Sequence, residues 1–474
     1  MSASVYIHWF RQDLRLNDNP AFLQASELGC VLPIYIFDDI NAGEYAMGSA
    51  SRVWLHHSLT SLSESLGGML SCYRGDASAI FEELISRFDV RGVCWNRCYE
   101  PWRIARDTGI KKMLGEKDIP VYSYNGSLLW EPWDIVKSDS SPYRVFTPYY
   151  NKGCLQYEPP RMPVTKTDKA HFEKDNASKT IDELSLLPTI RWDKKMVLHW
   201  KMGELGAQNR LKTFLHEGLN SYIGGRDMPG KCSVSRLSPH LHFGEISPHQ
   251  IWHAAQAVST GTVEKLHIEG FCRELGWREF SYNQLYFNPE LPKKNIRPMF
   301  DDFPWESNDA QIEAWQRGET GIPLIDAGMR ELWQTGYMHN RVRMVVGSFL
   351  VKNLRMHWHH GERWFWDCLF DADLANNSAG WQWVTGSGID AAPYFRIFNP
   401  VLQSKKFDPN ADYILKYLPV LTRLPVEHIH APYEAPQDVL RNAGIVLGED
   451  YPHPIVDLAT SRKRALEIYS SLSS

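Results

Sequence analysis

The 474-residue sequence has few of the features that mark secreted or metal-binding proteins. It holds only eight cysteines, and no two of them form a CxxC pair; Cys94 and Cys98 are the closest neighbours. We therefore expect free thiols in a reducing cytoplasm rather than a zinc site. His357, His359 and His360 also cluster, but positions i and i+2 do not share one helix face, so no metal site is expected there.

Long apolar segments are also missing. The longest apolar runs, such as residues 344–351, are far shorter than the roughly 20 residues that cross a bilayer. The first residues, MSASVYIHWFRQDLRL, show no basic stretch followed by an apolar core, so no secretory signal is expected. These absences predict a cytoplasmic protein with no membrane partner.

Positive charge is not in excess. The formal net charge is -5 and the isoelectric point is near 6.4, which excludes a uniformly basic surface for nucleic acid. A local basic groove remains compatible with this balance, because phosphate contacts depend on local rather than net charge.

Tryptophan, in contrast, is abundant. The chain has 18 tryptophans and 12% aromatic residues, and packing alone is not an obvious reason for so many indoles. The length exceeds the roughly 250–300 residues that one hydrophobic core supports, so two domains are expected.

The first 125 residues alternate short apolar runs with stretches of helical length. Such alternation predicts a doubly wound parallel α/β sheet, whose ligands bind at the carboxyl ends of the strands. No GxGxxG motif follows the first run, so a common dinucleotide site is not expected here. The expected strands are 5–10, 31–37, 69–73, 92–96 and 121–124, and the clearest expected helices are 51–66 and 77–88.

The remaining sequence divides into a connector and a helical half. Residues 131–200 are rich in proline with mixed charge, which is typical of a linker. Beyond residue 203, apolar residues recur at three-to-four spacing, which indicates helices. These are expected at 204–217, 248–258, 265–286, 309–320, 323–335, 340–357 and 361–369. The predicted domains are therefore an α/β domain at 1–130, a linker at 131–200 and an all-helical domain at 201–474.

One acidic block in the helical half stands out. Asp371 and Asp373 lie two residues apart, and Asn377, Trp381 and Trp383 follow them. Two carboxylates at this spacing can serve as acid–base partners or metal ligands, or can pair with arginine or cap a helix. The spacing alone leaves these alternatives open.

With its neighbouring motifs, the block resembles the photolyase/cryptochrome family. The motifs are WFRQDLRLNDNP at 9–20, SRLSP at 235–239, FGEISP at 243–248, RELGWREF at 273–280, MHNRVRM at 338–344 and the block itself. The resemblance is closest to bacterial cyclobutane pyrimidine dimer photolyases. It implies an α/β antenna domain, a long linker and an all-helical FAD domain. It also implies light-driven repair of dimers in ultraviolet-damaged DNA, by electron transfer from reduced, anionic FAD to a flipped dimer.

The resemblance also implies which residues hold the flavin. Asp371 and Asp373 fall where relatives hold its polar edge, Arg343 where a partner for Asp371 is expected, and Asn377 where a side chain faces flavin N5. The other positions implied for the cofactor are Tyr222, Val234, Ser235, Arg236, Leu237, Ser238, Phe271 and Arg278.

Five positions match those that contact the flipped dimer in relatives. Trp277 and Trp383 would stack on the lesion, and Glu274 would hydrogen-bond it and stabilise the dimer radical anion. The other two positions, Asn340 and Met344, hold a histidine pair in relatives that repair (6-4) photoproducts. The residues found here therefore favour dimer repair, and Asn377 favours repair over the alternative of a cryptochrome-type photoreceptor.

Further positions concern DNA, electron transfer and the antenna. The residues expected to contact DNA are Arg226, Arg278, Arg341, Arg396, Gln403 and Lys405. The residues that match the family's electron-transfer chain are Trp381, Trp358 and Trp305. The antenna positions are Met47, Arg52 and Glu100.

The antenna chromophore itself stays open in the sequence. A glutamate that holds a pterin in some relatives falls at Arg103 here. Methenyltetrahydrofolate in another pose, or an 8-hydroxy-deazaflavin, is therefore expected. A monomer is expected as well.

Overall fold

The computed structural model describes residues 4–166, 170–258 and 263–473. The chain divides into two compact units, each made of three segments. Unit 1 comprises Met1–Asn220, Ser235–Pro289 and Phe370–Ala375, and unit 2 comprises Ser221–Val234, Glu290–Leu369 and Asn376–Ser474. This division groups residues by compactness, so the domain boundaries expected at residues 130 and 200 stay a prediction.

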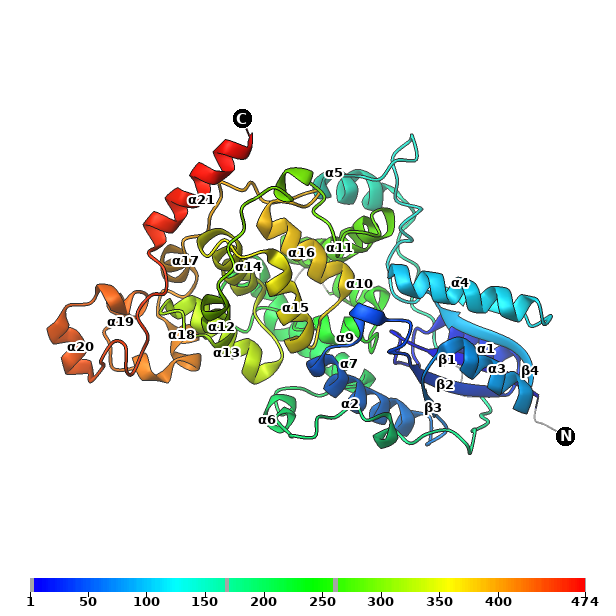
Figure 1. Cartoon of the computed structure of the whole chain (residues 1–474). Helices are drawn as coiled ribbons and strands as arrows, with labels where there is room; N and C mark the ends of the chain where they lie inside the picture. Colours follow the sequence, from blue (N-terminus) through cyan, green and yellow to red (C-terminus); the bar gives the residue numbers. More distant parts are fainter. Residues whose placement is uncertain (1–3, 167–169, 259–262, 474) are drawn as a thin grey trace. The chain divides into compact units, whose positions relative to one another are not determined.

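Unit 1 contains a five-stranded sheet in which every pairing is parallel (Figure 1). The strand order is β3-β2-β1-β4-β5. The strands are β1 (Ser4–Phe10), β2 (Val31–Phe37), β3 (Ser71–Arg74), β4 (Asp89–Asn96) and β5 (Val121–Tyr124). The predicted doubly wound sheet is confirmed, and its strand order reverses between β1 and β4, where ligands of such sheets bind.

Four helices of unit 1 follow individual strands of the sheet: α1 (Pro20–Leu28), α2 (Ser49–Ser65), α3 (Ala77–Arg87) and α4 (Pro101–Gly115). Trp9 of β1 packs in one apolar cluster with Phe81 of α3 and Ile110 of α4. Its neighbour Phe10 packs in another cluster, with Trp54 of α2. Successive strand residues point to opposite faces, so the apolar run of β1 is buried on both sides.

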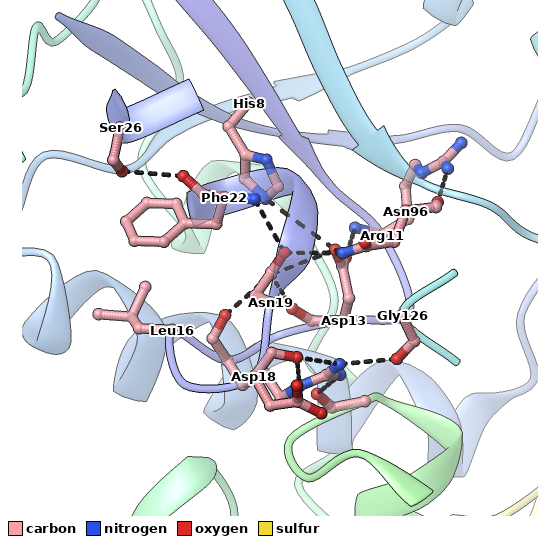
Figure 2. A network of polar contacts seen from close by, with 12 residues as sticks. His8, Arg11, Asp13, Leu16, Asp18, Asn19, Phe22, Ser26, Asn96 and Gly126 are labelled. Atoms are coloured by element: carbon pink, nitrogen blue, oxygen red, sulfur yellow. Dashed lines mark hydrogen bonds and ion pairs between the residues drawn. The ribbon is translucent and has the colours of Figure 1, made fainter. Parts of the chain in front are cut away.

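The loop between β1 and α1 is folded by its own polar side chains, as Figure 2 shows. Asn19 caps α1 by accepting from Phe22 N at 3.0 Å. Asn96, at the end of β4, donates to Asn19 Oδ1 at 2.7 Å and to Asp13 Oδ2 at 2.6 Å. The left-handed Asp18 (φ 50°) turns the chain between these residues. The loop is thus tied to the end of the neighbouring strand.

The rest of unit 1 consists of the connector and further helices. These are α5 (Phe146–Pro148), α6 (Asp193–Val197), α7 (Glu204–Thr213), α9 (Ser238–His242), α10 (Pro248–Gln256) and α11 (Lys265–Phe287). Glu279 of α11 holds the start of the connector, because its Oε2 accepts from Leu129 N at 2.8 Å and Trp130 N at 3.3 Å.

Unit 2 has helices and no strand among its described residues. Most of its helices follow one another from residue 309 to the C-terminal end of the described chain. They are α8 (Tyr222–Gly225), α12 (Asp309–Arg317), α13 (Pro323–Thr335), α14 (Asn340–Ser348), α15 (Trp358–Cys368), α17 (Pro400–Phe407), α18 (Asp412–Tyr417), α19 (Val426–Ile429), α20 (Gln437–Ala443) and α21 (Leu458–Ser473). Helix α16 (Leu374–Thr385) begins with residues assigned to unit 1. None of the helices within the described ranges is apolar over enough length to span a membrane.

The helix predicted over 340–357 is wrong in its second half. Helix α14 ends at Ser348, and a single π-helical turn, Phe349–Asn353, follows it directly. The chain then leaves the helix, because Arg355 adopts a left-handed conformation (φ 56°). Helix α15 begins at Trp358, earlier than the predicted residue 361, since His357 caps it by accepting from His359 N at 3.2 Å.

Candidate functional site

The acidic block brings its two aspartates to the start of helix α16, within unit 1. Ser238 Oγ donates to Asp371 Oδ2 at 2.5 Å. Asp373 is buried, accepts a short hydrogen bond from the Tyr282 hydroxyl, and lies 3.7 Å from His242 Nδ1. Burial opposes ionisation of Asp373, but His242, Arg278 and Tyr282 together lower its pKa to about 2. An acid this strong cannot act as a proton donor at neutral pH, so Asp373 is a fixed negative charge.

A turn of hydroxyls and backbone groups precedes helix α9. Ser235 O accepts from Arg210 Nε at 2.6 Å, and Leu237 is buried. Arg236 adopts a left-handed conformation (φ 53°), and its guanidinium lies 4.6 Å from the Trp200 ring centroid. Serine hydroxyls and arginine are chemically suited to a phosphate, so these residues fit a nucleotide cofactor. Val234, the residue before Ser235, belongs to unit 2 and is half-buried.

The two aromatic positions predicted for the cofactor are both buried. Phe271 of α11 packs against Phe214 with ring centroids 4.6 Å apart in unit 1. In unit 2, Tyr222 opens helix α8, and the guanidinium of Arg226 lies 5.4 Å from its ring centroid.

Asn377 has a fixed amide. Its Nδ2 donates to Glu362 O of helix α15 at 3.0 Å. This bond leaves Oδ1 as an acceptor that no hydrogen bond uses in the described chain. In the same unit, Arg343 Nε donates to Met338 O at 2.7 Å, and its guanidinium lies 5.3 Å from the Tyr337 ring centroid.

The five positions expected to contact the dimer fall on three helices. Glu274 and Trp277 lie at i and i+3 on α11, so they share one helix face. Trp277 stacks on Phe146 with centroids 3.7 Å apart and rings within 10° of parallel. Asn340 and Met344 form an i, i+4 pair on α14 in unit 2. The remaining residue is Trp383, which is half-buried on α16.

The three indoles expected to transfer electrons differ in exposure. Trp381 and Trp358 are buried, whereas Trp305 is partly exposed. Trp381 packs against Phe365 with ring centroids 5.0 Å apart, and a Cβ at Gly361 would lie within 3.0 Å of its ring. The other two are hydrogen-bonded: Trp358 Nε1 donates to Asn295 Oδ1 at 2.9 Å, and Trp305 Nε1 donates to Phe300 O at 3.2 Å.

The candidates for DNA contact divide into internally paired and exposed side chains. Arg341 Nη2 pairs with Asp227 at 2.9 Å, and Arg278 Nη1 donates to Ser127 O at 2.7 Å. Arg396 and Lys405, in contrast, are exposed to solvent. The other two are Arg226, which lies on Tyr222, and Gln403, which is half-buried.

The antenna positions lie after the carboxyl ends of β2 and β4. Arg52 Nε donates to Met47 O at 2.8 Å, and its Nη2 pairs with Asp39 at 3.0 Å. Glu100 is buried and pairs with Arg103 at 3.2 Å. Arg103 is thus part of an internal ion pair at the position where a pterin-binding glutamate was expected from relatives.

Several buried ionisable residues, among them Lys352 and Glu331, were missed in the sequence. Lys352 is fully buried in the π-helical turn, and its Nζ donates to Arg396 O at 3.1 Å. Burial, together with the charge of Arg396, lowers the Lys352 pKa to about 7. The only signal was a lysine inside the apolar run FLVKN. Glu331 accepts from His339 N at 3.0 Å and from Tyr413 Oη at 2.7 Å.

Comparisons with known proteins identify the family. The model for the FAD binding domain of DNA photolyase matches residues 271–471, and the DNA photolyase model matches 6–167. The chain is 46% identical over 474 residues to a deoxyribodipyrimidine photo-lyase of Agrobacterium fabrum, with 98% of each chain covered. It is 38% identical over 479 residues to cryptochrome-2 of Arabidopsis thaliana, covering 96% of this chain and 77% of the relative. A bacterial class III photolyase from Agrobacterium tumefaciens superposes with a TM-score of 0.95 at 43% identity, covering 100% of this chain and 98% of the other.

Proposed function

We propose that this chain, which belongs to the DNA photolyase and cryptochrome family, repairs cyclobutane pyrimidine dimers in DNA by using light. The dimer accepts one electron, its cyclobutane ring splits, and the electron is returned, so the reaction has no net redox change. The enzyme is therefore a carbon–carbon lyase, a deoxyribodipyrimidine photo-lyase, and its cofactor is FAD. Reduced FAD supplies the light-driven electron chemistry when bound.

The fixed amide of Asn377 is the observation that favours DNA repair over a photoreceptor function. A neutral amide held by Glu362 O presents Oδ1 as an acceptor without adding charge beside a cofactor. We assign Asn377 to the position that faces flavin N5, and Asp371 and Asp373 to the polar edge of the flavin. The ionised Asp373 orients N–H groups of a ligand, since a carboxylate is an acceptor only.

The remaining flavin contacts are proposed from their chemistry and their match to the family. The hydroxyls of Ser235 and Ser238 suit the diphosphate, and Arg343 provides a positive charge. The others are Tyr222, Val234, Arg236, Leu237, Phe271 and Arg278.

Lesion capture is proposed for Glu274 and the indoles of Trp277 and Trp383. A flat indole stacks on an extruded pyrimidine pair, and the dimer's weakened pairing lowers the cost of flipping it out of the duplex. Asn340 and Met344 complete this set, and neither side chain donates protons as (6-4) chemistry requires. The exposed Arg396 and Lys405 suit phosphate contacts.

Illumination of the reduced protein with dimer-containing DNA tests the proposal. We expect thymine absorbance to return in the light and to stay constant in a dark control. Glu274→Ala should lower repair per photon because the dimer radical anion loses a hydrogen-bonding partner. Glu274→Gln, which keeps the size, separates the role of the proton from the role of shape. If the protein with fully reduced flavin repairs no dimers, the proposal fails. The alternative is then a cryptochrome-type photoreceptor, which the likeness to a plant cryptochrome supports.

We further propose that electrons reach oxidised flavin through Trp305, Trp358 and Trp381. Trp381→Phe should slow light-driven flavin reduction, whereas repair by chemically reduced protein should persist. An unchanged reduction rate would contradict the chain.

The antenna, the DNA partner and the cellular setting are proposed on the same basis. Methenyltetrahydrofolate or an 8-hydroxy-deazaflavin is proposed near Met47, Arg52 and Glu100, and the absorption spectrum of the purified protein distinguishes the two. The proposed partner is ultraviolet-damaged DNA, bound by a cytoplasmic monomer. Size-exclusion chromatography with and without damaged DNA measures the oligomeric state.

A further inference from the structure

The imidazole of His357 contacts two of the three indoles proposed to transfer electrons. Its ring centroid is 5.2 Å from that of Trp305, in an edge-on contact at 76°. It is 5.6 Å from that of Trp358, with the planes 27° apart. The imidazole therefore contacts both indoles of the outer step, in which an electron passes from Trp305 to Trp358.

The position of His357 is fixed by helix α15. Its Nδ1 accepts from His359 N at 3.2 Å, as the N-cap of that helix. An accepting Nδ1 carries no proton, so the neutral ring has its proton on Nε2. Protonation of Nδ1 would remove this cap.

The ring is neutral at physiological pH. Burial is the largest cause that lowers the His357 pKa, and His359, His360 and Arg363 on α15 lower it further. Asp301, outside α15, raises it, and the result is a pKa of about 4. These four groups are the charged or titratable neighbours that act on His357.

We propose that His357 is a positioning residue that holds both Trp305 and Trp358 in place through contacts with its uncharged ring during electron transfer. The inference rests on the proposed function, in which these indoles form one chain. In the outer step one electron leaves Trp305 and fills the vacancy on oxidised Trp358. Trp305 is oxidised and Trp358 is reduced, and no bond forms or breaks. The oxidant is photoexcited oxidised flavin acting through Trp381, and an added thiol restores Trp305.

The absence of charge on the ring matters because positive charge must arrive on both indoles. The two centroid distances are nearly equal, so a cation at His357 would not favour one indole over the other. It would instead oppose the arrival of positive charge on the pair as a whole. A neutral ring provides the packing without this opposition.

Two variants separate the ring from the cap. His357→Asn keeps a side chain that caps helices well but removes the ring. His357→Phe keeps an aromatic ring but loses the cap. We expect the flavin of the full protein, oxidised and illuminated with thiol, to be reduced severalfold more slowly in His357→Asn than in His357→Phe. The reverse order would assign His357 to the helix cap alone and overturn the inference.

A second pair tests charge. His357→Lys and His357→Met have similar length and both lose the cap, but only lysine adds a cation. We expect light-driven flavin reduction to be about tenfold slower, or more, in His357→Lys than in His357→Met. A positive charge beside both indoles opposes their oxidation. Equal rates would contradict the requirement for a neutral ring.

A spectroscopic readout is independent of the flavin. The His357 ring signal in the NMR spectrum, assigned by its loss in His357→Asn, should titrate near pH 4. Titration at or above pH 7 would overturn the neutral state.

Trp305→Phe separates this inference from the proposed function. An unchanged reduction rate in Trp305→Phe would contradict the indole chain and, with it, the role of His357. If flavin reduction is slow in Trp305→Phe but normal in His357→Asn, only the role of His357 is contradicted. Repair by chemically reduced protein should be unchanged in every His357 variant.

Discussion

The two units bury positive charge in opposite ways. In unit 1 the buried Arg11 and Arg106 both pair with Asp107, and these two guanidiniums lower the pKa of Asp107 although its burial raises it. In unit 2 the buried Lys352 has only the carbonyl of Arg396 and the ring of Tyr394, 5.3 Å away, as polar neighbours in the described chain. The comparison teaches that the partner, not the depth of burial, decides which protonation state a buried group keeps.

Removing the buried carboxylate of Asp18, a second unit 1 carboxylate that pairs with arginine, should have the largest effect on stability. Asp18 accepts from Arg161 Nη1 at 2.5 Å and from Val164 N at 2.9 Å, and it also accepts from Ser247 Oγ. Asp18→Ala leaves these donors and the buried Arg15 without that charge, so we expect a loss of about 3–5 kcal/mol in the free energy of unfolding. Urea unfolding at pH 7 measures it.

The ionised state of Asp18 also predicts that stability falls in acid. Burial raises the pKa of Asp18, but Arg15, Arg161 and Ser247 lower it below the ordinary 3.8. The stabilisation is therefore present above about pH 4 and is lost as pH falls further. Asp18→Ala should lack that part of the acid transition. Asp89→Ala is the control, because Asp89 is partly exposed at the start of β4 and, among the described residues, pairs with Ser4 and Arg91. An equal loss of stability in Asp89→Ala would contradict the comparison.

In unit 2 the largest expected effect comes from aromatic packing. Gly361→Ala would place a Cβ within 3.0 Å of the Trp381 ring, and such overpacking costs about 1–3 kcal/mol. Light-driven flavin reduction should also slow, since Trp381 must move. Gly380→Ala is a matched control on a helix, because its Cβ would meet no atom within 4 Å. Equal destabilisation in both variants would show that the Trp381 contact is unimportant.

Replacing the buried Lys352, which donates to a carbonyl, should change stability in the opposite direction to Asp18→Ala. Its pKa is lowered from 10.5 to about 7 by burial and by Arg396, so the unfolded chain binds more protons than the folded chain between these values. Stability should therefore rise as pH increases from about 7 toward 10. Lys352→Met should abolish this rise and stabilise the protein at pH 6 by about 1–2 kcal/mol.

Urea midpoints at pH 6 and pH 9 measure this difference. Lys416→Met is the control, because Lys416 is exposed. A destabilised Lys352→Met at pH 6 would show that the bond to Arg396 O outweighs the buried charge, and the contrast between the units would fail.

Exposed pairs should have the smallest effect. Lys265 and Glu269 form an i, i+4 pair at 3.3 Å on α11, and both side chains are largely exposed. Lys265→Ala should change the free energy of unfolding by less than about 0.5 kcal/mol. A larger change in urea unfolding would mean that solvent-exposed partners matter as much as buried ones.

The elements that the sequence predicts best are those with one dominant periodicity. The apolar runs of β1 and β2 identify their strands, because both faces of the sheet are buried there. The start of α15 could not be read in this way, since it depends on the side chain of His357 as a cap. Lys352 was missed because a lysine in a helical pattern is normally exposed.

The candidate site follows the same division. The acidic block was visible through its motif, whereas the ion pair of Asp373 with His242 requires the tertiary structure. The contact of His357 with Trp305 likewise joins segments that are far apart in the sequence. Local patterns predict residue types and helices, but not which side chains meet.

The π-helical turn Phe349–Asn353 also sets the rotational phase of the chain. Relative to an unbroken α-helix, one added residue turns the side chains at the end of this helical segment by about 100°. Deleting a single residue in this turn would therefore rotate the chain after it and re-aim Leu354, rather than merely shorten the helix. The number of residues in this turn is in this sense an angular constraint, and insertions in it should be tolerated less well than in the connector of unit 1.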